Sequence, residues 1–427
     1  MAIETPARIA ILGAGPVGLE AALYGRYLGY EVSLYERGHV ADHVRQWGHV
    51  RMVTPFGLNR SPLGMAALAA QKPGWTPPDE DALLTGEEFI AQYLAPLSRS
   101  DLLADGLHEQ TQIEAVGRAG LLKGQEVDSS ARGDREFRLL LATTQPDGHV
   151  REHVATADAV IDCTGTFGNH NWLGTDGLPA IGELDSTSHI EYRLPDILGR
   201  HRDRYASRNV LLVGSGIEAA TNMIALSELA SQAPDTWITW ITPHACDERS
   251  PEPVIAATDA RLARQNRLAS VANRLAADDA NHVTFYSETT VDAVIWHPDL
   301  ERFAVSLTGK HGGDMEFDRV IANVGYRPDA TLCRELQFDA CHATEAPAAV
   351  GRARSAARGG SGPIEPFVWN AATLCTPEPD YYVLGAKSFG RDSGFLIHDG
   401  LNQIRALFAI LGDREDLDLY ATMKGLY

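Results

Sequence analysis

The stretch Arg8-Ile9-Ala10-Ile11-Leu12-Gly13-Ala14-Gly15-Pro16-Val17-Gly18 decides the fold of the N-terminal part of the chain. Five largely apolar residues run directly into a turn with the pattern Gly-x-Gly-x-x-Gly. A continuous apolar run of this kind is typical of a strand buried in a parallel sheet. Apolar side chains at Leu19, Ala22 and Leu23 then indicate a helix. The stretch therefore predicts a strand, a glycine turn and a helix.

The glycine turn has the chemistry of a dinucleotide-binding loop. Gly13 permits the tight turn, Gly15 lets the backbone approach a pyrophosphate, and Gly18 lets the helix pack closely on the strand. The next strand, Glu31 to Tyr35, ends in Glu36, whose carboxylate is placed to bind the ribose hydroxyls. The predicted contacts of this first site are Gly13, Gly15, Pro16, Val17, Gly18, Glu36 and Arg37.

A second copy of the pattern follows about 200 residues later. An apolar strand, Asn209 to Val213, precedes Gly214-Ser215-Gly216-Ile217-Glu218-Ala219. It predicts a second dinucleotide site with contacts at Gly214, Ser215, Gly216 and Ala219. The next strand, Trp237 to Ile241, ends in Thr242-Pro243-His244, without an acidic residue for the ribose. Together with Arg249 nearby, this absence favours NADPH, while Asp247 and Glu248 leave NADH open.

The segments around the two loops complete an α/β pattern. Alternating strands at 137–142 and 152–156, joined by a Pro-Asp-Gly turn, predict a β-meander. Apolar strands at 158–162 and 319–324 run into glycine turns, and a strand at 381–385 precedes a helix that begins near Asp399. The Ala/Gly/Arg-rich segment 343–363 is interpreted as a surface loop. We expect two Rossmann-like three-layer domains, with residues 186–325 inserted between the two parts of the first domain, 1–185 and 326–427.

The composition restricts the class of protein. The net charge of −20 disfavours nucleic acid and anionic membranes as partners. No apolar run approaches the roughly 20 residues of a membrane helix, and the N-terminus does not resemble a signal peptide, so we expect a cytoplasmic protein. The five cysteines include no CxxC pair, and no HExxH pattern is present, so no metal site is expected. A homo-oligomer is compatible with the sequence.

The order of these motifs resembles a known superfamily. The chain has the motif order of flavoproteins with two dinucleotide-binding domains. In sequence, the motifs are the first glycine turn, the meander, Asp162-Cys163-Thr164-Gly165, the second glycine turn and a strand ending in 324–329. The resemblance implies FAD on the first domain and NAD(P)H on the second. It also implies FAD contacts at Thr164, Gly165, Gly385 and Lys387, although relatives often carry Gly-Asp where this chain has Gly385-Ala386-Lys387. The helix after His398 and Asp399 would direct its N-terminal N–H groups at the flavin.

The reaction stays open among three classes. Disulfide reductases of this superfamily need two thiols beside the flavin, and the sequence has no such pair. We therefore expect an NAD(P)H-driven monooxygenase that uses O₂ and a flavin C4a-(hydro)peroxide to oxidise N or S of a small-molecule substrate. The alternative is an NAD(P)H-dependent flavin oxidoreductase that passes electrons to a small acceptor or a protein. A non-enzymatic flavin or NAD(P)H sensor is the third.

Similarity to flavin-containing monooxygenases points to the aromatic-rich stretch 43–62. It implies Asn59 beside the flavin C4a atom, Trp47 as a wall of the flavin and Arg45 as a further cofactor contact. The alternatives are a turn-capping role for Asn59 and a core position for Trp47. The fingerprint FxGxxxHxxx(Y/F) is matched only in part, because Ala180 replaces the phenylalanine and the gap from Gly182 to His189 is three residues too long.

Overall fold

The computed structural model describes residues 3–71, 74–246, 252–257, 259–278, 282–359 and 367–423. The chain divides into two compact units. Unit 1 comprises Met1–Arg45, Pro55–Asn169 and Tyr326–Tyr427, and unit 2 comprises Gln46–Thr54 and His170–Gly325. Both units are built on a parallel sheet, which confirms the predicted fold class. The predicted domain limits at 185 and 325 stay predictions.

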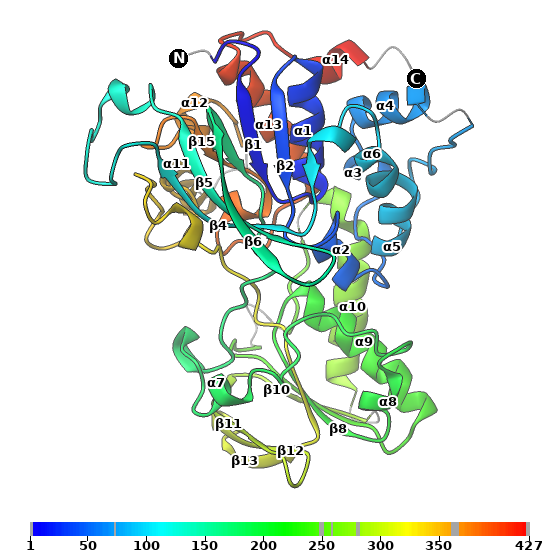
Figure 1. Cartoon of the computed structure of the whole chain (residues 1–427). Coiled ribbons are helices and arrows are strands. Elements are labelled where there is room, and N and C mark those ends of the chain that lie inside the picture. The colour runs from blue at the N-terminus through cyan, green and yellow to red at the C-terminus, as the bar shows by residue number, and fades with distance from the viewer. Residues whose placement is uncertain are drawn as a thin grey trace. The chain divides into compact units, whose positions relative to one another are not determined.

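The central sheet of unit 1 has the strand order β15-β7-β1-β2-β3 (Figure 1). Its strands are β1 (Arg8–Leu12), β2 (Glu31–Tyr35), β3 (Leu107–His108), β7 (Ala159–Asp162) and β15 (Tyr381–Val383). Helices α1 (Pro16–Tyr27) and α13 (Ile397–Leu411) pack together against it, and the side chain of Phe408 fills the space above Gly25. Because both faces are covered, β1 and β7 are apolar along almost their whole length.

The predicted β-meander forms a second, antiparallel sheet of unit 1. It consists of β4 (Thr111–Arg118), β5 (Phe137–Thr144) and β6 (Val150–Ala157). Its inner face shares one hydrophobic core with β1 and β7 through Val116, Phe137 and Leu139. Helix α2 (Asp42–Gln46) begins in unit 1, and its last residue belongs to unit 2. The smaller elements of unit 1 are α3 (Phe56–Asn59), α4 (Pro62–Gln71), α5 (Gly86–Phe89), the π-helical turn η1 (Ile90–Leu94), α6 (Ala95–Ser98), α12 (Ala371–Leu374) and α14 (Leu419–Met423).

The interpretation of residues 343–363 as a loop is wrong for most of its length. Helix α11 covers Ala348–Gly359, and residues 360–363 lie outside the described residues. Alanine is the strongest helix former, and four alanines between 348 and 356 outweigh the single glycine. Gly351 has a packing role, because a Cβ atom there would lie 2.5 Å from the Cβ atom of Cys341.

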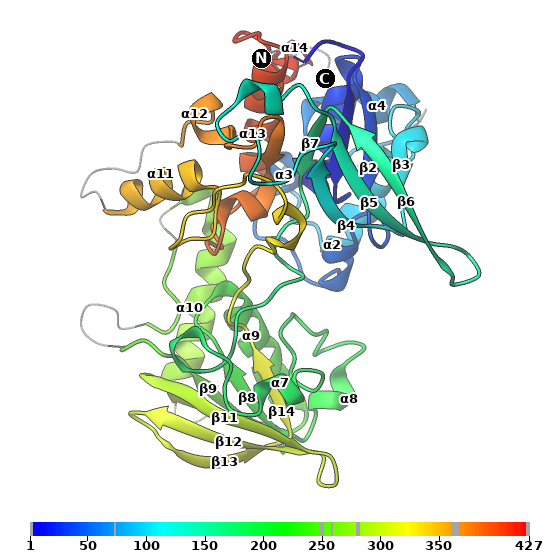
Figure 2. The same ribbon diagram turned by 60° about the vertical axis from the view of Figure 1, so that its left-hand side comes forward.

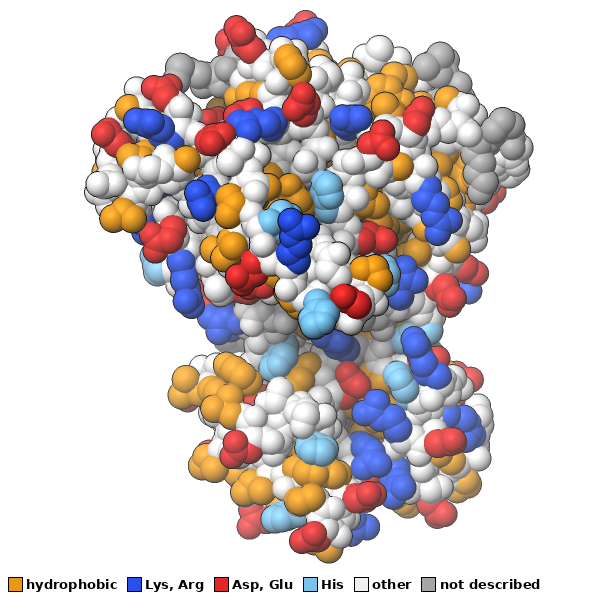
Figure 3. All heavy atoms as spheres, in the orientation of Figure 1, with side chains coloured by type: hydrophobic (Ala, Val, Ile, Leu, Met, Phe, Trp, Pro, Cys, Tyr) orange, Lys and Arg blue, Asp and Glu red, His pale blue; other side chains and the backbone are white. Residues whose placement is uncertain are grey.

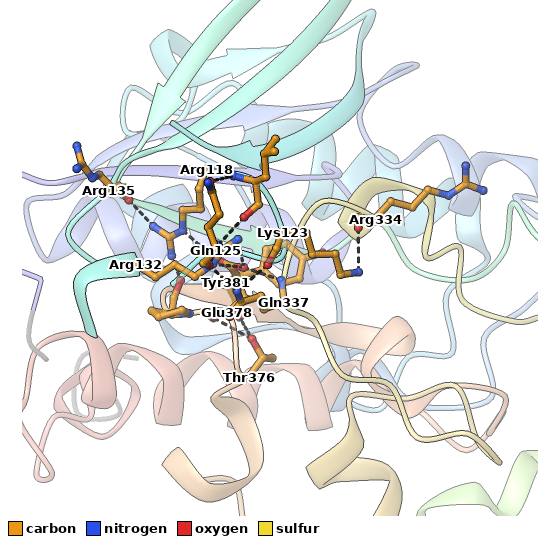
Figure 4. A network of polar contacts seen from close by, with 12 residues as sticks. Arg118, Lys123, Gln125, Arg132, Arg135, Arg334, Gln337, Thr376, Glu378 and Tyr381 are labelled. Carbon is orange, nitrogen blue, oxygen red and sulfur yellow. Dashed lines mark hydrogen bonds and ion pairs between the residues drawn. The ribbon is translucent and has the colours of Figure 1, made fainter. Parts of the chain in front are cut away.

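A buried cluster of charges closes the connection between β4 and β5 (Figure 4). The Glu378 carboxylate, just before β15, accepts hydrogen bonds from Arg118 Nε at 2.7 Å and from Arg132 Nε at 2.9 Å. The backbone N–H of Gln337 also donates to it, at 2.7 Å. All three charged side chains are almost completely buried. The cluster therefore joins three segments of unit 1 that are far apart in sequence.

Unit 2 repeats the layered plan around a sheet of order β10-β9-β8-β14 (Figure 2). Its strands are β8 (Asn209–Val213), β9 (Trp237–Ile241), β10 (Val283–Tyr286) and β14 (Arg319–Ala322), and the longer helices are α9 (Ile217–Gln232) and α10 (Ala263–Ala277). Alternate residues of β8 face opposite layers: Leu212 packs with the two helices and Leu211 with a second meander. That meander, which was not predicted, comprises β11 (Thr289–His297), β12 (Arg302–Gly309) and β13 (Gly313–Phe317). Short helices α7 (Glu183–Ser186) and α8 (Arg202–Tyr205) complete the unit.

Candidate functional site

A cavity of about 440 Å³ lies in unit 1, where β1, β2 and β7 end at the same edge of the sheet. Its lining includes ten of the predicted FAD contacts: Gly13, Gly15, Pro16, Val17, Glu36, Arg37, Thr164, Gly165, Gly385 and Lys387. These residues come from four separate parts of the chain. The carboxyl end of a parallel sheet is where such folds bind their ligands, and the cavity is the candidate cofactor site.

The three glycines of the first loop have the geometry that a dinucleotide requires. Gly13 has φ of +93°, and a Cβ atom there would lie 2.9 Å from the carbonyl oxygen of Cys163. A Cβ atom at Gly18 would lie 1.8 Å from the carbonyl oxygen of Gly13, so helix and turn are in direct contact. At Gly15, by contrast, no atom lies within 4 Å of such a Cβ. The first N–H groups of α1 are therefore open to an anion.

Hydrogen bonds from the first glycine loop and from Gly38 fix the side chain of Glu36. Its two carboxylate oxygens accept hydrogen bonds from the backbone N–H groups of Ala14 and Gly38, each at 2.9 Å. Burial raises the pKa of Glu36, and these two hydrogen bonds work in the opposite direction. Each oxygen keeps a further lone pair, which fits two ribose hydroxyl donors.

Lys387, which lines the cavity, forms a buried ion pair with Asp162 behind it. Asp162 Oδ2 accepts from Lys387 Nζ at 2.6 Å and from the Tyr381 hydroxyl at 3.0 Å. Asp162 Oδ1 accepts from the Thr164 hydroxyl at 2.6 Å and from its backbone N–H at 3.0 Å. Burial alone raises the pKa of Asp162, but the Lys387 ammonium and these hydrogen bonds hold it below its usual value. The predicted contact Lys387 thus reaches the cavity as an ammonium fixed by a carboxylate that sequence reasoning missed.

The cavity also has an aromatic wall. Phe167 and Phe395 line it, and the Phe167 ring lies 5.8 Å from His43 and 4.7 Å from Tyr326, centroid to centroid. Phe395 packs edge-on against Phe389. Sequence reasoning did not single these rings out, although Phe167 directly follows the Thr164-Gly165 turn. Aromatic side chains in the lining suit the flat, apolar ring of a flavin.

Cys163 is the one cysteine among the described residues that line the cavity. Burial raises its pKa well above the usual value, and the Asp162 carboxylate raises it further. Its thiol is therefore protonated at neutral pH and is a poor nucleophile.

Six other residues predicted for the first site do not line this cavity, and one of them, Gly18, packs α1 against the turn as described above. Asn59 is 3% exposed, at the end of α3, where its amide donates to the Pro55 carbonyl at 3.0 Å. Trp47 belongs to unit 2. Arg45 donates to the Val40 carbonyl at 3.3 Å, and Asp399 accepts from the backbone N–H of Leu396 at 3.0 Å. His398 lies with Asp399 in the first turn of α13. Their predicted contacts with the flavin stay predictions.

The second glycine loop has the same geometry as the first. Gly214 has φ of +134°, and a Cβ atom there would lie 2.2 Å from the carbonyl oxygen of Asn323. Gly216 precedes α9, and a Cβ atom added to it would meet no atom within 4 Å. Ser215 lies partly exposed between the two glycines. Ala219 is fully buried, where Gly18 lies in the first loop. Arg249 lies outside the described residues.

An arginine cluster lies in unit 2 near the start of α10. Arg264 and Arg267 are neighbours on one helix face, since they are three residues apart. Burial lowers the pKa of Arg264, and the charges of Arg51 and Arg267 lower it further. Within the described chain, Arg264 Nε is buried without a hydrogen-bond partner. Cations at a helix N-terminus are repelled by the positive end of the helix dipole. An anion bound here would reduce this repulsion and also the repulsion between the arginine charges.

The described residues provide neither a metal site nor a membrane-spanning helix. In the described part of the chain, no group of three or more His, Cys, Asp or Glu side chains is placed to hold a metal ion. No helix of these residues is long and apolar enough to cross a membrane.

Solved structures of flavoenzymes share the fold of the whole chain. A bacillithiol disulfide reductase from Bacillus cereus gives a TM-score of 0.66 at 15% identity, over 95% of this chain and 99% of that one. The cadaverine monooxygenase of the desferrioxamine pathway from Erwinia amylovora, solved with FAD, gives 0.62 at 12% identity, over 96% of both chains. A flavin-containing monooxygenase from Stenotrophomonas maltophilia gives 0.54 at 19% identity, over 95% and 98%. No protein-family model and no curated protein sequence matches the chain.

The neighbours include a disulfide reductase and two monooxygenases, and at 12–19% identity the likeness shows the fold. The chain therefore has the fold of the flavoproteins with two dinucleotide-binding domains.

Proposed function

We propose that this protein is an FAD-dependent oxidoreductase that takes electrons from NADPH. The observation that carries the proposal is the convergence of the first glycine turn, Glu36 and the Thr164 turn on one cavity, with an aromatic wall beside them. The backbone N–H groups of α1 bind the pyrophosphate, Glu36 binds the adenosine ribose, and the rings of Phe167 and Phe395 shield the flavin from water. When bound, the flavin accepts a hydride and passes electrons on.

Support for NADPH over NADH comes from the arginine cluster of unit 2. α10 follows β9, the strand after which the adenosine ribose lies in this type of fold. Arg264 and Arg267, at the start of this helix, would bind the 2′-phosphate, a group that NADH lacks.

Kinetics with both nucleotides test this assignment. R264A and R267A should each raise KM for NADPH about tenfold and leave KM for NADH unchanged, because one charge-assisted contact is lost. Arg274, exposed near the far end of the same helix, is the matched control. An equal rise in both KM values would contradict the assignment.

For the reaction, we propose oxygen insertion at a nitrogen or sulfur atom of a small molecule. The cavity supports it through Cys163, whose protonated thiol has no second cysteine beside it in the described lining. A disulfide reductase needs a thiolate relay, and one high-pKa thiol does not provide it. Oxygen insertion needs no such side chain, only a dry pocket around the flavin.

A flavin reductase without oxygen insertion is the second candidate. One observation favours it: Asn59, the residue implied for the position beside the flavin C4a atom, hydrogen-bonds to its own helix and does not line the cavity. Rapid mixing of the NADPH-reduced protein with oxygenated buffer separates the two candidates. A transient spectrum, distinct from oxidised and reduced flavin, would support oxygen insertion. Direct return to oxidised flavin, with rapid anaerobic reduction of quinones, would support the reductase.

A further inference from the structure

Unit 1 has a second cavity, of about 500 Å³, which the cofactor does not need. It lies between β3, the edge strand of the parallel sheet, and the inner face of the β4–β6 meander. His108 and Glu109 lie on the β3 side, and Arg151 and His153 lie on β6. Figure 3 shows His and Lys or Arg side chains, with Asp and Glu side chains among them, on the face of unit 1 that carries β6.

The polar residues of this cavity occupy positions that elsewhere belong to the core. On β6, Arg151 and His153 lie on the same face as Ala155 and Ala157, because strand residues alternate. Ala157 is fully packed in the core, and Leu141, opposite His153, belongs to the same cluster. The inner face of the meander therefore changes from a dry core to a polar hollow along a single strand.

The one arginine of the hollow lacks a partner among the described residues, whereas its one acid is already engaged. The Arg151 side chain has no hydrogen bond or ion pair to any described residue. Burial lowers the pKa of His108, and His153 lowers it further, but a neutral imidazole still offers an N–H donor. Of the residues lining the cavity, Glu109 is the one acid, and it already accepts from the backbone N–H of Val40 at 2.6 Å.

We propose that this hollow binds a small organic anion: a carboxylate on a flat apolar body. Arg151 and the two histidines hold the carboxylate, because they offer donors from both walls of the cavity. Leu107 and Ala155, both partly exposed, provide the apolar surface. Beside them His108 stacks on the ring of the nearly buried Tyr35, with 5.1 Å between the ring centroids.

The hollow is connected to the cofactor cavity by two hydrogen bonds. Tyr35 and Thr111 line both cavities. The Glu36 N–H donates to the His108 carbonyl at 2.9 Å, and the Thr111 N–H donates to the Glu36 carbonyl at 2.8 Å. A ligand that moves β3 also moves Glu36. The bound anion therefore changes the affinity for FAD, a consequence that rests on the proposed function.

Calorimetric titration of the purified protein with benzoate tests the site. Benzoate should bind, and benzyl alcohol and inorganic phosphate should each bind at least about tenfold more weakly, since each lacks half of the recognised chemistry. R151Q should weaken benzoate binding about tenfold. Arg138, on the outer face of β5 in the same meander, is the matched control, and R138Q should change the affinity by less than about twofold.

Equal binding to R151Q and to the unaltered protein would overturn the proposal, as would benzyl alcohol binding as tightly as benzoate. The coupling is measured separately, as the dissociation constant of FAD with and without saturating benzoate. An unchanged constant would overturn the coupling. If FAD did not bind under any condition, the proposed function would fail, and benzoate binding to the same protein would still decide whether the site exists.

Discussion

At the scale of single residues, the Asp162–Lys387 pair is the most demanding feature of the cofactor cavity. Both side chains are removed from water, with Lys387 at 5% exposed and Asp162 fully buried. An ion pair that is desolvated in this way is tolerated only when its geometry is good and its remaining donors and acceptors are satisfied. The hydroxyl groups of Tyr381 and Thr164 donate hydrogen bonds to the remaining lone pairs of the Asp162 carboxylate.

We expect K387M to lower the free energy of unfolding by about 3 kcal/mol, because it leaves Asp162 buried without a counterion. D162N/K387M should recover at least half of this loss, since an amide at position 162 keeps its Thr164 partner. Urea unfolding of the unaltered protein, the two single variants and the double variant completes the cycle. Strictly additive effects would mean that the two charges do not interact.

The glycines of the first loop give a second prediction at this scale. G15A should fold normally, since the added methyl group meets no atom of the protein, but should weaken FAD binding at least about tenfold, because the methyl group occupies the space of the pyrophosphate. G18A should destabilise the protein by at least about 4 kcal/mol, because its methyl group collides with the Gly13 carbonyl. Circular dichroism and FAD fluorescence measure the two effects. FAD binding by G15A at the unaltered affinity would argue against this position of the phosphates.

At the scale of elements, helix α1 carries a buried titratable side chain, Glu20, which does not line the cofactor cavity. Glu20 is 2% exposed and accepts a hydrogen bond from the Ser61 hydroxyl at 2.8 Å, just before α4. Burial raises the pKa of Glu20 to about 7, against the opposing effects of Ser61 and Tyr420. The contact between α1, α4 and α14 is therefore linked to proton uptake.

The sign of this linkage follows from the raised pKa. Between pH 4.5 and 7 the folded protein holds a proton on Glu20 that the unfolded chain has lost, so stability falls as pH rises through this range. E20Q removes the dependence. We expect its stability relative to the unaltered protein to be about 3 kcal/mol higher at pH 8 than at pH 5. Urea unfolding at the two pH values measures this, with E31Q, at an exposed position of β2, as the control. A pH-independent difference would contradict the prediction.

At the scale of the whole molecule, the two units should respond to different nucleotides. Hydrogen exchange with FAD should slow around residues 9–19, 163–166 and 385–389 of unit 1. Exchange with NADP⁺ should slow around residues 213–219 and 263–268 of unit 2. Ligands protect the amides that they contact and those in the elements that they stabilise. Protection of unit 1 by NADP⁺ and of unit 2 by FAD would reverse the assignment of the two loops.

The elements that could be predicted from the sequence are those whose signal lies within a few neighbouring residues. β1 and β2 have the predicted bounds, because an apolar run that ends in a glycine turn or an acidic residue is complete within a few positions. Asp162 and Lys387 are 225 residues apart, and nothing close to either indicates the partner. The loop predicted at 343–363 failed differently: the Ala/Gly/Arg-rich composition was interpreted as a loop, although its alanines favour the helix that forms there.

The discontinuity of unit 1 has a consequence for synthesis on the ribosome. The sheet of unit 1 needs β15 beside β7, and the Glu378 cluster and α13 also come from the last part of the chain. Unit 2 ends at Gly325 and so emerges complete while the last strand of unit 1 is still unmade. Nascent chains stalled beyond residue 360 should therefore contain a protease-resistant unit 2 and an unfinished unit 1. The inserted unit becomes native first, although the chain begins with the other one.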